Sequence, residues 1–248
     1  MKIIDAFWEE RNLGRRTAEI VVEKDDSFPV LLETLGRIEK EKDYIVVKFP
    51  PTFVPSWQEL ESRGYRFAEC LLSFAIQISE FHEKKEYRLF REEQGIEKVD
   101  TPEQLAYLQG EFRKGIFETD RIALSPFFGA EKGNFRYSMW VNDLFSKPVS
   151  SHFFITWKGK RVGFFSIREC GKGTAQGLLT GIFQGFRKKH LGFGVVYHPL
   201  KLLKEKGFVR YSTVVSSNNL PAVRLYPHFG FQVTEIQNVF VRCFPEME

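Results

Sequence analysis

The chain has 248 residues, of which 43% are hydrophobic and 27% are charged. This composition is typical of a chain that folds around a core, and it excludes disorder and low complexity. The formal net charge of +4, from 36 basic and 32 acidic residues, is too small and too evenly mixed to indicate nucleic-acid binding.

The first third of the chain alternates between strand-like and helix-like segments. Strands are predicted at 18–22, 44–49 and 65–78, and helices at 29–42 and 56–63. Residues 81–114 are dense in charge, and we expect helix and connector there, with one helix beginning at Thr101. The pattern predicts a small α/β domain over residues 1–85 and a helical connector over residues 86–115.

The second half predicts a larger α/β domain over residues 116–248. A helix at 134–144 is followed by apolar runs at 152–157 and 161–167, which a Lys-Gly-Lys turn joins as a hairpin. The remaining elements are expected to alternate, with strands at 177–184, 211–215 and 231–243 and helices at 195–206 and 220–229.

Residues 60–69 and 225–235 share a helix, a Gly-aromatic pair and a strand. This similarity indicates that the two halves of the chain are related. The alternative is that any helix-to-strand turn uses glycine followed by a hydrophobic residue.

The cellular location is inferred from the length of the charge-free runs, from the N-terminal sequence and from the cysteines. The longest charge-free run has fourteen residues, 173–186, whereas a membrane span needs roughly 20 apolar residues. The N-terminal sequence MKIIDAFWEERN shows no targeting signal. Cys70, Cys170 and Cys243 are far apart and form no CxxC pair, which favours neither disulfides nor a zinc site. We therefore expect a cytoplasmic protein without a bound metal.

The most informative stretch runs from Asn219 to Phe231. On a helix that begins near Leu220, the residues Ala222, Leu225 and Tyr226 are spaced by three and four, so they share one face. For the pattern alone, the alternative is an ordinary amphipathic helix with a buried tyrosine. The stretch resembles the closing region of the GCN5-related N-acetyltransferase (GNAT) superfamily, which it matches at Asn219, Ala222, Leu225, Tyr226, Gly230 and Phe231.

The resemblance implies a mixed α/β acyl-CoA N-acyltransferase fold, preceded by a smaller, partial domain of the same type. It also implies a loop of the form Gln/Arg-x-x-Gly-x-Gly/Ala that holds the diphosphate of acetyl-CoA. Residues 168–173 match the letters of this loop, whereas residues 189–194 match the glycines and have Lys189 in first place. Only the second segment leaves room for just one helix and one strand before Asn219, so we take it as the loop.

Backbone N–H groups at a helix N-terminus bind anions, and the helix dipole adds to their effect. The loop residues expected to contact the diphosphate are Lys189, His190, Leu191, Gly192, Phe193 and Gly194. Arg187, Lys188 and Lys189 are candidates for the 3′-phosphate of CoA, with a solvated basic turn as the alternative. Pro199 lies within the next predicted helix and predicts a kink or a late start, because proline lacks a backbone donor.

The remaining roles are also implied by the resemblance. Tyr226 is expected to act as general acid towards the CoA thiolate, and Asn219 to orient the pantetheine arm or a water molecule. The other cofactor contacts are expected at Ala222 and Leu225, and at the backbone of Ile182, Phe183 and Gln184. The general base stays open: Asp143, His152 and Glu169 are titratable, and each is expected to be a surface or structural residue.

Over the whole chain, the layout is similar to that of the bacterial TDP-fucosamine acetyltransferases and their amino-sugar relatives. Residues 8–14, residues 136–140 and the Ser212-Thr213-Val214 sequence carry this resemblance. It implies transfer of an acetyl group from acetyl-CoA to the amine of a nucleotide-linked amino sugar. The expected partners are these two substrates, with a homodimer allowed for.

Two other functions compete with this interpretation. One is GNAT-type acyl transfer to another small-molecule or peptide amine, and the other is acyl-CoA binding without catalysis. An acidic acceptor cleft favours a polyamine-like substrate, and basic residues there favour a nucleotide diphosphate.

Overall fold

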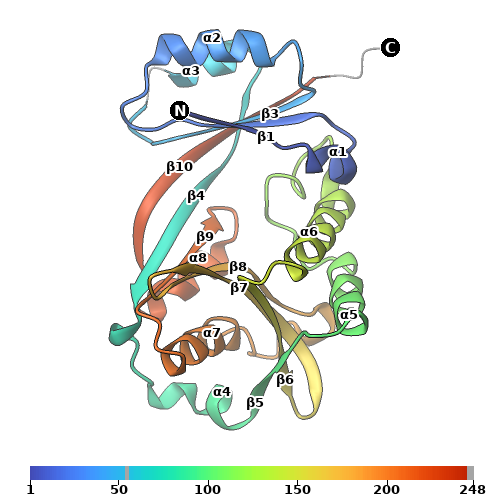
Figure 1. The fold of residues 1–248 in the computed structure, drawn as a ribbon, viewed down its shortest axis with the longest axis vertical. Helices are drawn as coiled ribbons and strands as arrows, with labels where there is room; N and C mark the ends of the chain where they lie inside the picture. Colours follow the sequence, from blue (N-terminus) through green and yellow to red (C-terminus); the bar gives the residue numbers. More distant parts are fainter. Residues whose placement is uncertain (54–55, 245–248) are drawn as a thin grey trace.

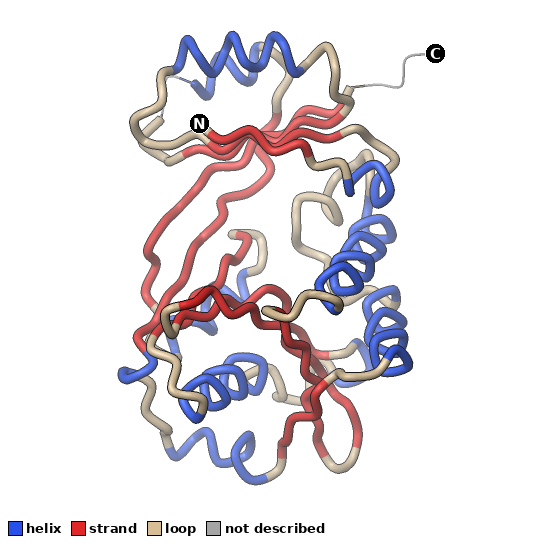
Figure 2. The backbone as a smooth tube through the Cα atoms, in the orientation of Figure 1, coloured by secondary structure: helices blue, strands red, loops and turns tan. Residues whose placement is uncertain are grey.

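A computed structural model of the chain describes residues 1–53 and 56–244. Among these residues, ten strands form one mixed sheet in the order β1-β2-β3-β10-β4-β9-β8-β7-β6-β5 (Figures 1 and 2). The strands are β1 (Lys2–Asp5), β2 (Thr17–Val21), β3 (Tyr44–Phe49), β4 (Arg66–Gln77), β5 (Gln94–Lys98), β6 (Ser150–Trp157), β7 (Lys160–Gly171), β8 (Thr174–Ile182), β9 (Arg210–Ser216) and β10 (Gln232–Cys243). The helices are α1 (Trp8–Leu13), α2 (Phe28–Ile38), α3 (Ser56–Ser62), α4 (Arg88–Glu92), α5 (Pro102–Arg113), α6 (Gly129–Phe145), α7 (Gly194–Glu205) and α8 (Leu220–His228).

Each half of the chain inserts a strand of 12 residues, β4 or β10, between strands of the other half. β10 lies between β3 and β4, and β4 lies between β10 and β9. Both strands cross the space between the upper and lower parts of the molecule (Figure 1). The proposed units 1–85 and 116–248 therefore share one sheet.

The two exchanged strands begin in the same way. Each follows a helix and a glycine with positive φ, Gly64 at 84° and Gly230 at 92°. The next residue donates its N–H to a helical carbonyl, from Tyr65 to Leu60 and from Phe231 to Tyr226. Glycine suits this left-handed position because it has no Cβ. The similarity between residues 60–69 and 225–235 thus corresponds to a shared local structure.

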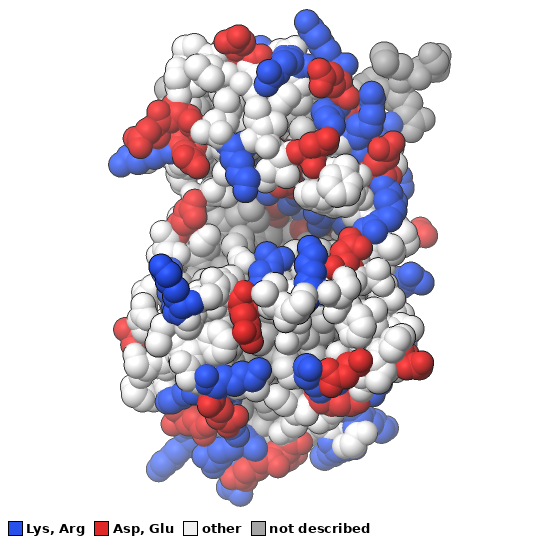
Figure 3. Space-filling view, viewed as in Figure 1, with Lys and Arg blue, Asp and Glu red and all other residues white. Residues whose placement is uncertain are grey.

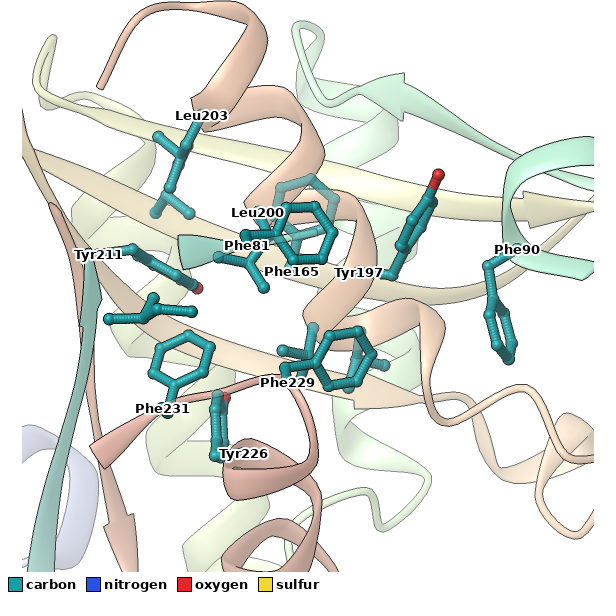
Figure 4. Packing of buried hydrophobic residues seen from close by; sticks show 14 of the residues in the cluster. Phe81, Phe90, Phe165, Tyr197, Leu200, Leu203, Tyr211, Tyr226, Phe229 and Phe231 are labelled. Atoms are coloured by element: carbon teal, nitrogen blue, oxygen red, sulfur yellow. The ribbon is translucent and has the colours of Figure 1, made fainter. Parts of the chain in front are cut away.

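Apolar helix faces cover the sheet and form its core. α2 and α3 cover the N-terminal strands, with Leu31, Leu35 and Leu60 fully buried. In the lower part, α7 lies against β7 and β8 and buries a row of residues beside Phe165, Phe229 and Phe231 (Figure 4). Each such large apolar side chain contributes about 1.5–3 kcal/mol when fully buried.

One strand of the connector is not predicted from the sequence, because its residues are mostly polar. Residues 86–115, expected to be a helical connector, also contain the strand β5, which pairs antiparallel with β6. Its Glu97 forms an ion pair with Arg161 of β7, so charge stabilises this edge instead of alternating apolar residues. The predicted helix start at Thr101 is confirmed, since Thr101 and Gln104 form a capping box at the N-terminus of α5.

Charged side chains of both signs are interspersed over the face that Figure 3 shows, and the surface is hollowed between the upper and lower parts. Within the described ranges, no helix combines the length and apolar character needed to cross a membrane.

Candidate active site

The site begins where two neighbouring parallel strands separate. β8 and β9 pair only from Thr174–Arg210 to Gly177–Thr213. Beyond this point β8 continues along β7, and β9 continues along β4. The register of β8 shifts between Gly177 and Leu179, and such a bulge bends a strand away from its neighbour. The separated strands leave a wedge with open backbone edges on both sides.

A cleft of about 670 Å³ occupies this wedge. Its walls are the ends of β8 and β9, the first turns of α8, the loop before α7, and the segment between α5 and α6. Gly177 lies at its closed end, where a Cβ would stand 2.4 Å from the hydroxyl oxygen of Tyr211. Thr213 Oγ1 donates a hydrogen bond of 3.1 Å to the Gly177 carbonyl. Glycine at this position therefore leaves room for the Tyr211 side chain.

Tyr226 of α8 lines the cleft and is 4% exposed. Its ring stacks on Phe74 of the exchanged strand β4, with centroids 5.5 Å apart, and lies edge-on to Phe231 (Figure 4). Burial raises the pKa of Tyr226 to about 12, although interaction with Thr213 lowers it. The phenol is therefore protonated at neutral pH and can donate a proton into the cleft.

Asn219 begins α8 and lines the same cleft. Its Oδ1 accepts a hydrogen bond of 3.2 Å from the Ala222 N–H, so it caps the helix. Ala222 and Leu225 follow on the cleft side. The face predicted from their spacing thus lies on the cleft, with Asn219 fixed by its capping bond.

The loop before α7 has the backbone of an anion-binding site. Residues 187–193, which overlap the predicted loop 189–194 and are here called the diphosphate loop after that expectation, contain two left-handed residues, Lys188 (φ 63°) and His190 (φ 57°). Such conformations turn successive N–H groups towards one point and are strained outside glycine. In the described chain, the amides of residues 188–193 donate no backbone hydrogen bond. His190, Leu191 and Gly192 line the cleft.

Several residues predicted to bind the cofactor lie outside the cleft walls as described. Phe183 is 1% exposed, belongs to the core beside α5, and donates its N–H to Val162. Gln184 begins a 3-10 turn that is exposed to solvent. The open edge of β8 is residues 178–182, so among the predicted backbone contacts only Ile182 lines the cleft.

Three predicted loop residues also have other partners. The Lys189 ammonium lies 5.1 Å from the ring centroid of Phe186, and Phe193 stacks on Phe90 at 5.8 Å. A Cβ on Gly194 would stand 2.1 Å from Gln94 Oε1, so packing requires this glycine. The Gly194 N–H donates to the Leu191 carbonyl. α7 runs unbroken from Gly194 to Glu205, so the late start expected from Pro199 is wrong.

The other end of the cleft is formed by residues 115–120, here called the acceptor segment, and by Tyr137 of α6. Asp120 Oδ1 accepts the N–H groups of Ile122 and Ala123 at 2.8 and 2.7 Å. Its Oδ2 is buried, and burial together with this carboxylate raises the pKa of Tyr137. The rings of Phe117 and Tyr137 stack with centroids 4.0 Å apart. This end of the cleft combines aromatic rings with two carboxylates, Glu118 and Asp120.

Sequence reasoning missed the acceptor segment and placed the titratable candidates elsewhere. Asp143 pairs with Arg11 at 2.7 Å, and Glu169 is exposed on β7. His152 is 2% exposed, bonds to Ser166 Oγ at 2.7 Å, and has its pKa lowered to about 4 by burial. The described cleft walls include none of these three. The sequence signal for this segment is a pair of acids, Glu118 and Asp120, which follow Gly115 without a helix or strand pattern.

Comparisons with known proteins agree with this geometry. Residues 117–231 match the model of the acetyltransferase (GNAT) family. A search of curated proteins found no significant match. Among solved structures, a protein of unknown function from Staphylococcus epidermidis superposes with a TM-score of 0.66 at 10% identity, covering 93% of this chain and 85% of that one.

Two other solved structures are similar over most of their length. A GCN5-related N-acetyltransferase from Sphaerobacter thermophilus has a TM-score of 0.65 at 12% identity, with 100% of this chain and 77% of that one covered. A tandem GNAT protein from the clavulanic acid biosynthesis pathway has a TM-score of 0.57 at 11% identity, with coverages of 94% and 76%.

The fold is that of the GNAT acetyltransferases, with a smaller N-terminal part of the same type. Over residues 117–231 the chain is a GNAT acetyltransferase domain. Acetyl-CoA is the co-substrate of this family. The described residues contain no group of three or more His, Cys, Asp or Glu side chains placed to hold a metal ion.

Proposed function

We propose that the chain transfers an acetyl group from acetyl-CoA to the amine of a small molecule. The observation that carries this proposal is the wedge between β8 and β9, with the protonated phenol of Tyr226 on its wall. In the same cleft, the diphosphate loop supplies left-handed backbone and free amides at the N-terminus of α7. One cleft thus offers an anion site, an open strand edge and a proton donor.

The residues present fit acetyl-CoA, which supplies an activated thioester when bound. The amides of residues 188–193 would hold the diphosphate, because they donate no backbone hydrogen bond within the described chain. The open edge of residues 178–182 would bond the pantetheine amides as an added strand. The small side chain of Ala222 leaves room beside α8.

Tyr226 would supply the proton that the leaving sulfur needs. Its ring packs against Phe74 and Phe231, and its hydroxyl interacts with Thr213. The raised pKa keeps the proton on the phenol until negative charge develops nearby. Asn219 would use the donors of its amide for the pantetheine arm or a water, because its oxygen is committed to the Ala222 N–H.

Two acceptor classes are proposed. A nucleotide-linked 4-amino sugar follows from the whole-chain resemblance, and the rings of Phe117 and Tyr137 could stack on such a ligand. A cationic amine without phosphate is supported by Glu118 and Asp120 at the acceptor end. Arg187 and Lys188, the lysine and arginine side chains on the described cleft walls, both belong to the diphosphate loop. Because Arg187 pairs with Glu118 at 2.9 Å, the support for a cationic amine rests on Asp120.

We propose that the reaction takes place in the cytoplasm, in keeping with three free cysteines, Cys70, Cys170 and Cys243.

A thiol reagent that detects free CoA tests the proposal, because transfer to an amine releases CoA from acetyl-CoA. The panel of amines should contain polyamines, aminoglycosides and TDP-4-amino sugars. Tight CoA binding with no turnover on any amine would favour a binding protein instead. Sedimentation of the same sample tests for a homodimer.

A further inference from the structure

Arg187 connects the two ends of the cleft. It belongs to the diphosphate loop, yet its guanidinium contacts the acceptor segment at three oxygen atoms. Nη1 lies 2.9 Å from Glu118 Oε1, and Nη2 donates to the carbonyls of Ile116 at 2.7 Å and Gly115 at 3.2 Å. A guanidinium suits this task because its planar fork donates several bonds in fixed directions.

The acceptor segment is held from its other side as well. Arg121, directly after the segment, is 2.9 Å from Glu19 and 3.4 Å from Glu69, which lie on β2 and β4. Its pKa is raised well above the usual value, because burial disfavours the charge less than these acids favour it. At the start of the segment, Gly115 has a φ of 98°. The stretch with Phe117 and Asp120 is therefore fixed to the N-terminal strands at one end and to Arg187 at the other.

We infer that Arg187 is a positioning residue, which makes the shape of the acceptor pocket depend on the order of the diphosphate loop. The inference rests on the proposed function and deepens it. When the loop amides hold a diphosphate, the backbone of the loop becomes less mobile. Because Arg187 is bonded to residues 115–118, these residues become less mobile as well. The cofactor thereby prepares the pocket for the amine. Of the three bases proposed for the 3′-phosphate, Arg187 is the one already committed to protein oxygens.

Hydrogen exchange tests the link without any acceptor. The wild type, Arg187→Ala and Lys188→Ala are compared with and without CoA, since Lys188 is an exposed neighbour in the same loop. In Arg187→Ala, we expect amides 115–120 to exchange about tenfold faster than in the wild type, and CoA to protect them no longer. Lys188→Ala should keep the wild-type rates in the ligand-free protein. Equal ligand-free rates in all three proteins would overturn the inference.

The competing role, direct contact with phosphate, is separated by calorimetry. In Arg187→Ala, the Kd values of CoA and 3′-dephospho-CoA should both stay within about twofold of the wild type. A loss confined to CoA would make Arg187 a phosphate ligand and overturn the inference. If the wild type binds no CoA, the proposed function fails, whereas the ligand-free exchange experiment still decides whether Arg187 holds the segment.

A kinetic experiment follows once an acceptor is known. The KM of the amine should rise about tenfold in Arg187→Ala, with Arg187→Lys intermediate because one bond can re-form. Glu118→Gln should shift KM in the same direction by less, since it keeps a neutral acceptor. An unchanged KM in Arg187→Ala would refute the positioning role.

Discussion

The hydroxyl of Thr180 on β8 hydrogen-bonds the carbonyl oxygen of Val195 on α7, at 3.3 Å. That carbonyl has no helical partner, because the residue four positions later is Pro199, which lacks an N–H. A side chain of β8, which forms one wall of the cleft, thus supplies the hydrogen bond that the Val195 carbonyl of α7 lacks. This is how the sequence accommodates a proline inside α7, and it gives a first prediction.

Thr180→Val should lower the free energy of unfolding by about 1–2 kcal/mol, because the Val195 carbonyl then loses its donor. The single proton of this hydroxyl is shared with the Phe164 carbonyl at 3.0 Å, so part of the loss comes from that bond. In a Pro199→Ala background, where the helix supplies its own N–H, the same substitution should cost less. Chemical denaturation of the four proteins gives the coupling energy, expected to be at least about 0.5 kcal/mol. Strict additivity would contradict the explanation.

The two glycines of the loop motif should respond differently to substitution. Gly194→Ala places a Cβ 2.1 Å from Gln94 Oε1, so the amide must give up its 3.1 Å bond to His198. We expect a loss of about 1–2 kcal/mol in unfolding free energy, which Gln94→Ala should partly relieve. Gly192 has no atom within 4 Å of the Cβ position, so Gly192→Ala should keep its stability and weaken CoA binding. Thermal melts and calorimetry of both variants separate the two cases.

The sequence predicts the parts of this site that depend on residues close together in the chain, and it misses those that depend on residues far apart in the chain. The face of Ala222, Leu225 and Tyr226 follows from helical periodicity, and it lies on the cleft. Gly194 matches a motif letter, yet its neighbour Gln94 lies a hundred residues earlier in the chain, so the reason for glycine is visible only in the structure.

The strand exchange and the acceptor segment share this difficulty. Periodicity indicates that β4 and β10 are strands, but their order in the sheet is set by long-range pairing. The acceptor segment, residues 115–120, has no regular structure, and β5 replaces alternating apolar residues with an ion pair between Glu97 and Arg161. Neither produces a periodic signal in the sequence.

Tyr226→Phe should lower kcat by about 10²-fold or more and leave the Kd of CoA nearly unchanged, because a proton donor acts only in the transition state. Tyr211→Phe is the matched control. Tyr211 is also buried, at 3% exposed, but its hydroxyl packs over Gly177 at the closed end of the wedge. We expect its kcat to change much less. Single-turnover measurements ensure that chemistry is observed, and an unchanged rate in Tyr226→Phe would exclude the acid role.

Protonation of His152 should destabilise the protein in mild acid. Burial lowers the pKa of His152 from 6.5 to about 4, so below pH 6.5 the unfolded state takes up a proton that the folded state excludes. The stability from this group is complete above pH 6.5 and is lost as pH falls towards 4, by up to about 3 kcal/mol. His152→Gln should flatten the pH dependence of the unfolding free energy by about one proton in this window.

The chain should bind one CoA, although its two halves have related folds. In the N-terminal half, β2 and β3 stay paired from Thr17–Tyr44 to Val21–Lys48, and the Val22 N–H extends the pairing. Among the described residues, these two strands leave no wedge like the one beyond Gly177 for a pantetheine arm. Calorimetry should give a stoichiometry near one. Gly192→Trp, which fills open space at the cleft, should abolish binding entirely, and residual binding near one equivalent would reveal a second site in the N-terminal half.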